Sequence, residues 1–254
     1  MKLQPVSIPW MGGPRLAGLL YLPDRPINGA AVILAHGFTS GKYSMDALSS
    51  YLAARGRVCL TYDVVGHKLG STGGRMMHMR QAAENMTAAI TGLRSEFSPV
   101  SVVLAGHSMG AAAAISSAAI DLESPHTSSP LAGIACICMG VNPTSGFEST
   151  LGAAMLLQRA DYVEGAPAPN LLAGLDRLLE SATKLTSPAL PALMIAARND
   201  VLLPTDSVRK LSEIIGKSAD LRVIDAQHID APDKARGVIA NWLQDLDADG
   251  GETG

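Results

Sequence analysis

Short apolar runs recur along the chain, and polar residues or glycine bound each of them. The runs with the length and the Val, Ile and Leu content of buried parallel strands are 30–35, 58–62, 100–105, 131–139, 192–197 and 221–224. Between them, helical patterns span residues 45–55, 76–97, 109–122, 205–215 and 234–246. Strands that alternate with helices predict a parallel sheet with helices on both faces.

Two segments depart from this alternation. Residues 5–10 and 16–21 flank the glycine-rich MGGPR, which predicts an antiparallel hairpin on the sheet edge. Residues 141–187 hold two helical patterns, LGAAMLLQRA and NLLAGLDRLLESATKL, separated by the proline-rich EGAPAPN, where the next strand is due. We predict a small helical cap there, because loops above about 15 residues without structure are uncommon. The alternative is an ordinary crossover helix with a long loop.

The predicted fold class is α/β, a three-layer α/β/α sandwich with a mostly parallel sheet. Residues 1–140 and 188–254 form its core, and residues 141–187 form the cap insertion. A chain of 254 residues with 47% hydrophobic content can bury one sizeable core. The final segment ADGGETG, residues 248–254, is predicted to be a disordered tail.

Charge and hydropathy narrow the range of partners. The net charge is -3 and the charged residues are spread along the chain, so we expect no nucleic acid partner. The N-terminus has no signal-peptide pattern, and no later segment has the roughly 18 uninterrupted apolar residues of a membrane span. These patterns predict a cytoplasmic protein with a small-molecule substrate, and they leave its oligomeric state open.

The three cysteines lie in apolar runs, so we predict no disulfide framework. Alternate residues of a strand share a face, which makes Cys136 and Cys138 conceivable metal ligands. No other Cys or His nearby completes a site, so we predict that both thiols are buried packing groups. The prediction is no metal and no cofactor.

The strongest chemical signal is the G-x-S-x-G pattern Gly106-His107-Ser108-Met109-Gly110. It directly follows the strand pattern VSVVLA and directly precedes the alanine-rich helix pattern MGAAAAISSAAI. That context is typical of a nucleophile elbow, in which a serine occupies a strained turn between strand and helix. We therefore predict that Ser108 is a nucleophile.

A serine hydroxyl needs a base to remove its proton and a carboxylate to orient that base. In open α/β sheets such groups collect beyond the carboxyl ends of the strands. Asp200 and His228 follow the strand patterns 192–197 and 221–224, so we predict that they are the acid and the general base. The alternatives are a helix-leading turn residue for Asp200 and a solvent-exposed loop histidine for His228.

Three other carboxylates are alternatives to Asp200 as the orienting acid. Asp225 and Asp230 flank His228, and close neighbours along a chain rarely face each other across a hydrogen bond. Asp63 ends the strand pattern 58–62, where YDVVGHKLGS is more typical of a structural turn. All three therefore rank below Asp200.

The reaction also needs hydrogen-bond donors for an oxyanion. We predict the backbone N–H of Met109, directly after the nucleophile, and the backbone N–H of Phe38, in the loop after the strand pattern 30–35. Gly37 lets that backbone come close. His36 and His107 are predicted to brace the structure.

These motifs resemble the α/β-hydrolase superfamily across nearly the whole chain. The matching segments are HGF at 36–38, YDVVGHKLGS from Tyr62, GHSMG at 106–110, RND at 198–200 and QH at 227–228. The chain is similar in particular to small esterases and acyl-hydrolase-like members, and the order Ser108, Asp200, His228 is the one this fold uses. It departs from the second motif, D-x-x-G-H-G-x-S, at Lys68 and Leu69, where one glycine is usual.

The resemblance implies a carboxylic ester hydrolase that works through an acyl-enzyme and uses no cofactor. We predict a small or medium hydrophobic acyl group, because methionine and leucine adapt to apolar ligands. The predicted substrate-binding residues are Met76, Met77, Leu151 and Met155. The alternative is that these residues only pack the cap against the core.

Other activities are compatible with the same triad. A thioesterase for acyl carriers would need a basic rim, and Lys42, Lys68, Arg75 and Arg80 are the candidates for one. A carbon-carbon bond hydrolase is a second alternative. A ligand receptor with slow or no turnover is the non-enzymatic one.

Overall fold

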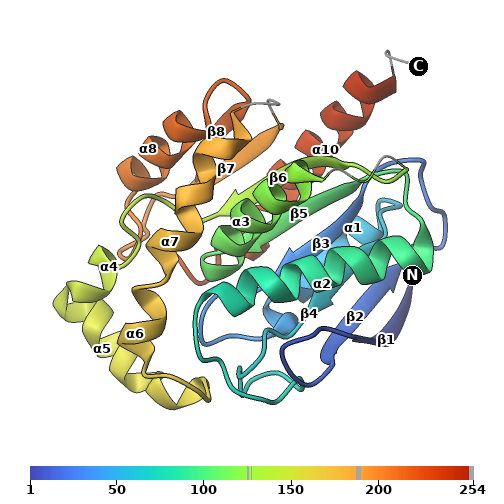
Figure 1. Ribbon diagram of the computed structural model, residues 1–254. Coiled ribbons are helices and arrows are strands. Elements are labelled where there is room, and N and C mark those ends of the chain that lie inside the picture. The colour runs from blue at the N-terminus through green and yellow to red at the C-terminus, as the bar shows by residue number, and fades with distance from the viewer. Residues whose placement is uncertain (125, 127, 187–189, 252–254) are drawn as a thin grey trace.

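The computed structural model describes residues 1–124, 126, 128–186 and 190–251. Its strands form one eight-stranded sheet in the order β1-β2-β4-β3-β5-β6-β7-β8, as Figure 1 shows. The strands are β1 (Lys2–Ile8), β2 (Leu16–Leu22), β3 (Ala31–Ala35), β4 (Cys59–Tyr62), β5 (Val102–His107), β6 (Leu131–Ile137), β7 (Ala192–Ala197) and β8 (Ala219–Ile224).

The pairing is parallel from β4 to β8, whereas β1 and β2 form the antiparallel hairpin and β2 also pairs antiparallel with β4. Every residue of β3, β4, β5 and β7 is buried, as expected for parallel strands between two layers of helices. Within β3, Val32 and Leu34 face one core and Ile33 and Ala35 face the other. The predicted sandwich is therefore the observed fold.

Helices cover both faces of the sheet (Figure 1). One core contains side chains of α2 (Arg80–Phe97), α3 (Met109–Glu123) and α8 (Thr205–Ile215). The other contains side chains of α1 (Asp46–Ala53), α9 (Ala231–Lys234) and α10 (Arg236–Gly251). The 3-10 helix η1 (Lys42–Met45) leads into α1.

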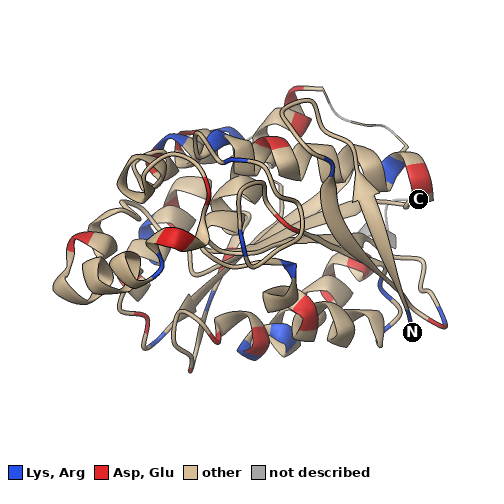
Figure 2. Cartoon of the chain, turned by 90° about the horizontal axis from the view of Figure 1, so that it is seen from below, with Lys and Arg blue, Asp and Glu red and all other residues tan. Residues whose placement is uncertain are grey.

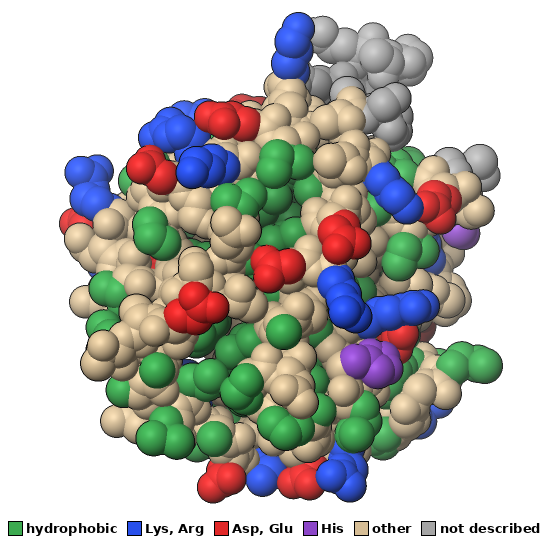
Figure 3. Space-filling model, turned by 60° about the vertical axis from the view of Figure 1, so that its left-hand side comes forward, with side chains coloured by type: hydrophobic (Ala, Val, Ile, Leu, Met, Phe, Trp, Pro, Cys, Tyr) green, Lys and Arg blue, Asp and Glu red, His purple; other side chains and the backbone are tan. Residues whose placement is uncertain are grey.

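Between β6 and β7 the chain forms short helices beside the sheet. They are α4 (Ser145–Glu148), α5 (Thr150–Gln158), η2 (Ala160–Tyr162), α6 (Ala168–Leu172), α7 (Leu175–Leu179) and η3 (Glu180–Leu185). The last three elements pack leucines into the core of α2 and α3, whereas α4 buries no residue fully and α5 buries only Gly152. Figure 3 shows hydrophobic side chains gathered on this side of the molecule.

Several element boundaries differ from the sequence predictions, and three of these differences have a visible cause or consequence. The helix expected from residue 76 begins at Arg80, because Met76 is held in extended pairing by Glu164 and Ala166. The strand expected to reach residue 139 ends at Ile137, because Cys138 has a positive φ of 51°. The predicted disordered tail is wrong for residues 248–251, which continue α10, and residues 252–254 lie outside the described part.

No helix in the described part of the chain combines the length and the apolar character needed to cross a membrane.

Candidate active site

Ser108 occupies a sharp turn between β5 and α3. Its backbone has φ 53° and ψ −119°, a conformation that costs a non-glycine residue energy and is maintained by the surrounding packing. A Cβ atom on Gly106 would lie 2.2 Å from the carbonyl of Gly110, and one on Gly110 would lie 2.3 Å from the carbonyl oxygen of Ala35. The two glycines of the motif therefore allow strand and helix to approach closely around the serine.

Asp200 and His228 form a hydrogen-bonded pair beyond the ends of β7 and β8. The carboxylate Oδ2 lies 2.7 Å from Nδ1 of His228, and Oδ1 accepts hydrogen bonds from the backbone N–H groups of Leu202 and Leu203 at 2.9 Å each. The Asp200 side chain is fully buried. Burial alone would raise the pKa of Asp200, but the contact with His228 and the two backbone donors lower it below its ordinary value. Asp200 is therefore an ionised partner that holds the imidazole in one orientation.

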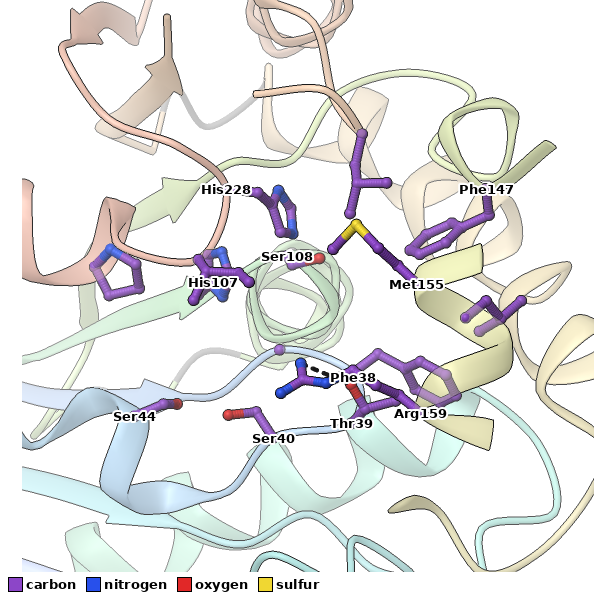
Figure 4. A pocket seen from close by; sticks show the side chains of 15 residues that line it. Phe38, Thr39, Ser40, Ser44, His107, Ser108, Phe147, Met155, Arg159 and His228 are labelled. Carbon is purple, nitrogen blue, oxygen red and sulfur yellow. Dashed lines mark hydrogen bonds between the residues drawn. The ribbon is translucent and has the colours of Figure 1, made fainter. Parts of the chain in front are cut away.

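Ser108 and His228 line the same cavity, which has a volume of about 120 Å³. Figure 4 shows their side chains next to each other. Phe38, in the loop after β3, lines the same cavity, and Met109 is the first residue of α3. First-turn N–H groups of a helix have no acceptor within the helix, so the Met109 N–H is free to serve a ligand.

The predicted substrate residues do not gather at this cavity. Met155, from α5, lines it. Met76 is instead fully buried in the core, Met77 and Leu151 are more than half exposed, and these three residues lie outside the cavity lining. They were predicted from their apolar, adaptable side chains, and no local pattern indicates which cavity a side chain faces.

The cavity also contains residues that the sequence analysis did not identify. Phe147 and Arg159 come from α4 and from the end of α5, and Thr39 follows Phe38 in the loop after β3. None of them belongs to a motif of fixed spacing. The folding of the segment between β6 and β7 brings Phe147 and Arg159 to the cavity of Ser108.

Asp63, the rejected rival to Asp200, organises the neighbouring loops. Its carboxylate accepts hydrogen bonds from the backbone N–H of Ser71 and from both the backbone N–H and the Nζ of Lys42, the last at 2.5 Å. Both side chains of the Lys42–Asp63 ion pair are buried. Asp63 is therefore committed to a structural pair away from the cavity. In the adjoining loop, where the sequence departs from the motif D-x-x-G-H-G-x-S, the backbone N–H of Lys68 donates a hydrogen bond to the Tyr162 carbonyl.

Of the four candidates for a basic rim, Lys42 is buried in its ion pair with Asp63 and cannot belong to one. Lys68, Arg75 and Arg80 are exposed, and each lies within 4 Å of a carboxylate, Glu164 for the first two and Glu84 for the third. Figure 2 shows basic and acidic residues interspersed over the helices and loops of the view from below. The predicted rim is therefore reduced to three exposed cations with acidic neighbours.

Three histidines around the site are buried and neutral. Burial lowers the pKa of His67 and of His107 to about 3, with smaller contributions from His36 and His228 respectively, and burial likewise lowers the pKa of His36. His36 Nε2 accepts a hydrogen bond from the Val64 N–H, so this residue braces the loop after β3. Within the described residues, the Nε2 atoms of His67 and His107 have no hydrogen-bond partner, so no acceptor would stabilise a proton on them.

These buried histidines predict acid sensitivity. Their pKa is lowered in the folded state, so only the unfolded chain takes up protons as the pH falls below about 6.5, and stability is lost in that direction. For three such groups, the free energy of unfolding should be about 4 kcal/mol lower near pH 5.5 than near pH 7.5, measured by urea unfolding. His67→Gln should reduce this difference by about a third, whereas His78→Gln, at an exposed position, should leave it unchanged. Equal unfolding midpoints at both pH values would contradict the prediction.

Cys138 lies closer to histidines than its sequence neighbours suggested. The potential ligand atoms of His107, Cys138 and His228 lie within 4.8 Å of one another. The prediction that no histidine lies close enough to Cys138 to complete a metal site is therefore wrong. Cys136 faces the opposite core, because the positive φ of Cys138 breaks the alternation of the strand. The two cysteines consequently cannot act as a pair.

Comparisons with known proteins agree with the architecture. The sequence matches the alpha/beta hydrolase family over residues 32–247. Among curated proteins, none matches the chain.

Solved structures of similar fold include hydrolases of several kinds. An esterase of Pyrococcus furiosus is 18% identical, with a TM-score of 0.71 over 96% of this chain and 92% of that chain. An alpha/beta hydrolase of Penicillium sp. is 20% identical, with a TM-score of 0.71 over 97% and 98% of the two chains. A thioesterase domain from the curacin biosynthetic pathway is 15% identical, with a TM-score of 0.64 over 96% and 100%. At these identities the likeness concerns the fold alone.

Proposed function

Because the chain belongs to the α/β-hydrolase family, we propose that it is a serine hydrolase that cleaves carboxylic esters through an acyl-enzyme. The observation that carries this proposal is the hydrogen-bonded Asp200–His228 pair, whose histidine shares a cavity with the strained Ser108. The chemistry needs only side chains and backbone N–H groups of this chain and water.

In the proposed reaction, Ser108 Oγ attacks the ester carbonyl while His228 removes its proton. Asp200 engages Nδ1, so Nε2 is the nitrogen left to exchange protons with the serine and the leaving group. His228 then protonates the departing alcohol, and the acyl group stays on Ser108. A water molecule, activated by the same histidine, releases the carboxylic acid and restores the serine.

The oxyanion of each tetrahedral intermediate would accept hydrogen bonds from the N–H groups of Phe38 and Met109. Such donors act in an enclosed cavity, where removal of one typically costs on the order of 100-fold or more in rate. Support comes from the location of both residues beside Ser108, one at the cavity wall and one at the start of α3.

We further propose that residues 141–187 act as a cap over the reaction site. Phe147, Met155 and Leu156 from this segment line the cavity together with Leu202 and Ile229 from the core. The cap therefore supplies much of the apolar wall. A volume of about 120 Å³ favours short acyl groups.

The test is steady-state hydrolysis of p-nitrophenyl esters from acetate to decanoate by the wild type and by Ser108→Ala. We expect serine-dependent turnover with an optimum at short acyl chains. Turnover that persists in Ser108→Ala, or its absence for every chain length, would overturn the proposal. Thioesters of the same acyl groups, measured in parallel, decide whether sulfur or oxygen esters are preferred.

The acyl-length limit is predicted to depend on Leu156. A second cavity of about 860 Å³ lies on the other side of this residue, and Phe147 and Leu156 line both cavities. Leu156→Ala should join them and raise the ratio of octanoate to butyrate kcat/KM by about tenfold or more, since each buried methylene contributes about 0.8 kcal/mol. Leu151→Ala is the control, because that side chain is 54% exposed on the same helix and lines neither cavity. An unchanged profile in Leu156→Ala would show that the two cavities stay separate.

A further inference from the structure

Arg159 places a cation at the wall of the cavity that contains Ser108. It follows directly after α5, and its guanidinium donates from Nη1 to Thr39 Oγ1 at 3.3 Å. The guanidinium carbon also lies 5.2 Å from the ring centroid of Tyr162. Figure 4 shows the guanidinium extending from α5 toward the loop of Phe38, Thr39 and Ser40.

This cation differs from the other enclosed arginines of the protein. Arg57 is paired with Asp247, and Arg94 is paired with Asp121 through two hydrogen bonds. In the described residues no carboxylate lies within ion-pair distance of Arg159, and no acidic residue lines the cavity. A half-buried guanidinium without a counter-ion has donors and charge available for a ligand.

The surroundings of Arg159 divide the cavity into two halves. Thr39, Ser40 and Ser44 contribute hydroxyl groups on the side of Arg159 (Figure 4). The rest of the lining contains the apolar side chains of Phe147 and Met155 together with Ser108 and His228 (Figure 4). Thr39 has a φ of 63°, which is costly for a β-branched residue, yet the loop holds it there with its side chain hydrogen-bonded to Arg159.

We propose that this cavity selects esters that carry a carboxylate a few atoms from the scissile bond, with Arg159 as the residue that binds it. A guanidinium matches a carboxylate by two parallel hydrogen bonds, and the nearby hydroxyls can donate to the remaining lone pairs. The inference rests on the proposed ester hydrolysis, since it assigns the substrate class of the same site.

A purely structural role for Arg159 makes a different prediction. If its task were only to fasten α5 to the loop of Thr39, its loss would affect charged and neutral esters equally. A binding role instead affects the charged ester selectively, and mainly through KM. The ratio of the two activities therefore separates the alternatives.

The experiment compares charged esters with isosteric neutral ones, with the released acid titrated at constant pH. Monoethyl succinate against ethyl 4-methylpentanoate tests a carboxylate on the acyl side. 3-Acetoxypropanoate against 3-methylbutyl acetate tests one on the alcohol side. Each pair is measured with the wild type, Arg159→Gln, Arg159→Lys and the surface control Arg209→Gln, whose side chain is 53% exposed.

We expect the wild type to favour the charged member of one pair, and Arg159→Gln to lower that charged-to-neutral ratio of kcat/KM about 10- to 100-fold through KM. Arg159→Lys should retain part of the ratio, and Arg209→Gln should retain all of it. Equal losses for both members, or a wild type that favours the neutral member of both pairs, would overturn the inference while leaving ester hydrolysis intact.

Failure of the proposed function is recognised separately, as absence of turnover for all four esters. The inference is then measured by calorimetric binding of monoethyl succinate and 3-acetoxypropanoate to Ser108→Ala and to Ser108→Ala combined with Arg159→Gln. Binding that depends on Arg159 supports an anion site. Binding that does not depend on it, or no binding, contradicts one.

Discussion

Ser108→Ala should lower kcat for the best p-nitrophenyl ester by about a million-fold, because the acyl-enzyme cannot form and His228 and Asp200 then have no nucleophile to activate. Residual catalysis of about a thousand- to ten-thousand-fold over water can remain from the oxyanion donors and from substrate binding. Stability should change little, because alanine removes only a hydroxyl from a side chain that makes no hydrogen bond with the described residues. The elbow conformation itself is maintained by the backbone hydrogen bond from the Ser108 N–H to the Ile137 carbonyl.

Covalent labelling gives an independent measure of the same prediction. A fluorophosphonate should form one adduct with the wild type, located on Ser108 by peptide mass spectrometry, and none with Ser108→Ala. Ser40 and Ser44 line the same cavity and serve as internal controls, since among the described residues neither is hydrogen-bonded to a histidine and Ser44 Oγ donates to the Gly41 carbonyl. An adduct on either of them, or equal hydrolysis by Ser108→Ala, would move the nucleophile elsewhere.

Local sequence signals were sufficient for most of the sheet and its helices. The strand 192–197 and the helix 205–215 were predicted at their observed bounds, because an apolar run and Pro204 mark them clearly. Boundaries set by distant partners were not predictable. Met76 pairs with the segment at Gly165 instead of joining α2, and that contact depends on how the segment between β6 and β7 folds.

The residues of the candidate site also separate into those that local sequence signals predict and those placed by distant contacts. Ser108 was predicted from the G-x-S-x-G motif between a strand and a helix, and Asp200 and His228 from their places at strand ends, which follow from the order of elements. Much of the cavity wall was not predicted, because Phe147 lies on α4 and Arg159 directly follows α5, and the orientation of these short helices depends on packing with the core. An amphipathic pattern indicates that a face is covered, but it does not identify what covers it.

Asp200→Asn should lower kcat by about ten-thousand-fold while the fold is retained. Asparagine keeps a side-chain oxygen to accept the N–H groups of Leu202 and Leu203, so the turn after β7 is preserved. It loses the charge that stabilises a protonated His228, and its amide N–H can hold the imidazole in the wrong tautomer. Urea unfolding of the variant should show an intact cooperative transition, which separates loss of catalysis from loss of structure.

The flanking carboxylates supply matched controls for this prediction. Asp225 accepts a hydrogen bond from Asn199 Nδ2 at 3.1 Å, and Asp230 accepts one from the Gln227 N–H at 2.7 Å. Both are therefore engaged away from the imidazole, so Asp225→Asn and Asp230→Asn should each cost less than about tenfold in kcat. If either control lost as much activity as Asp200→Asn, or if Asp200→Asn stayed within tenfold of the wild type, the orienting role would not belong to Asp200. The proposed triad would then be wrong about its acid even if Ser108 were the nucleophile, because the hydrogen bond from His228 to Asp200 would have no part in the reaction.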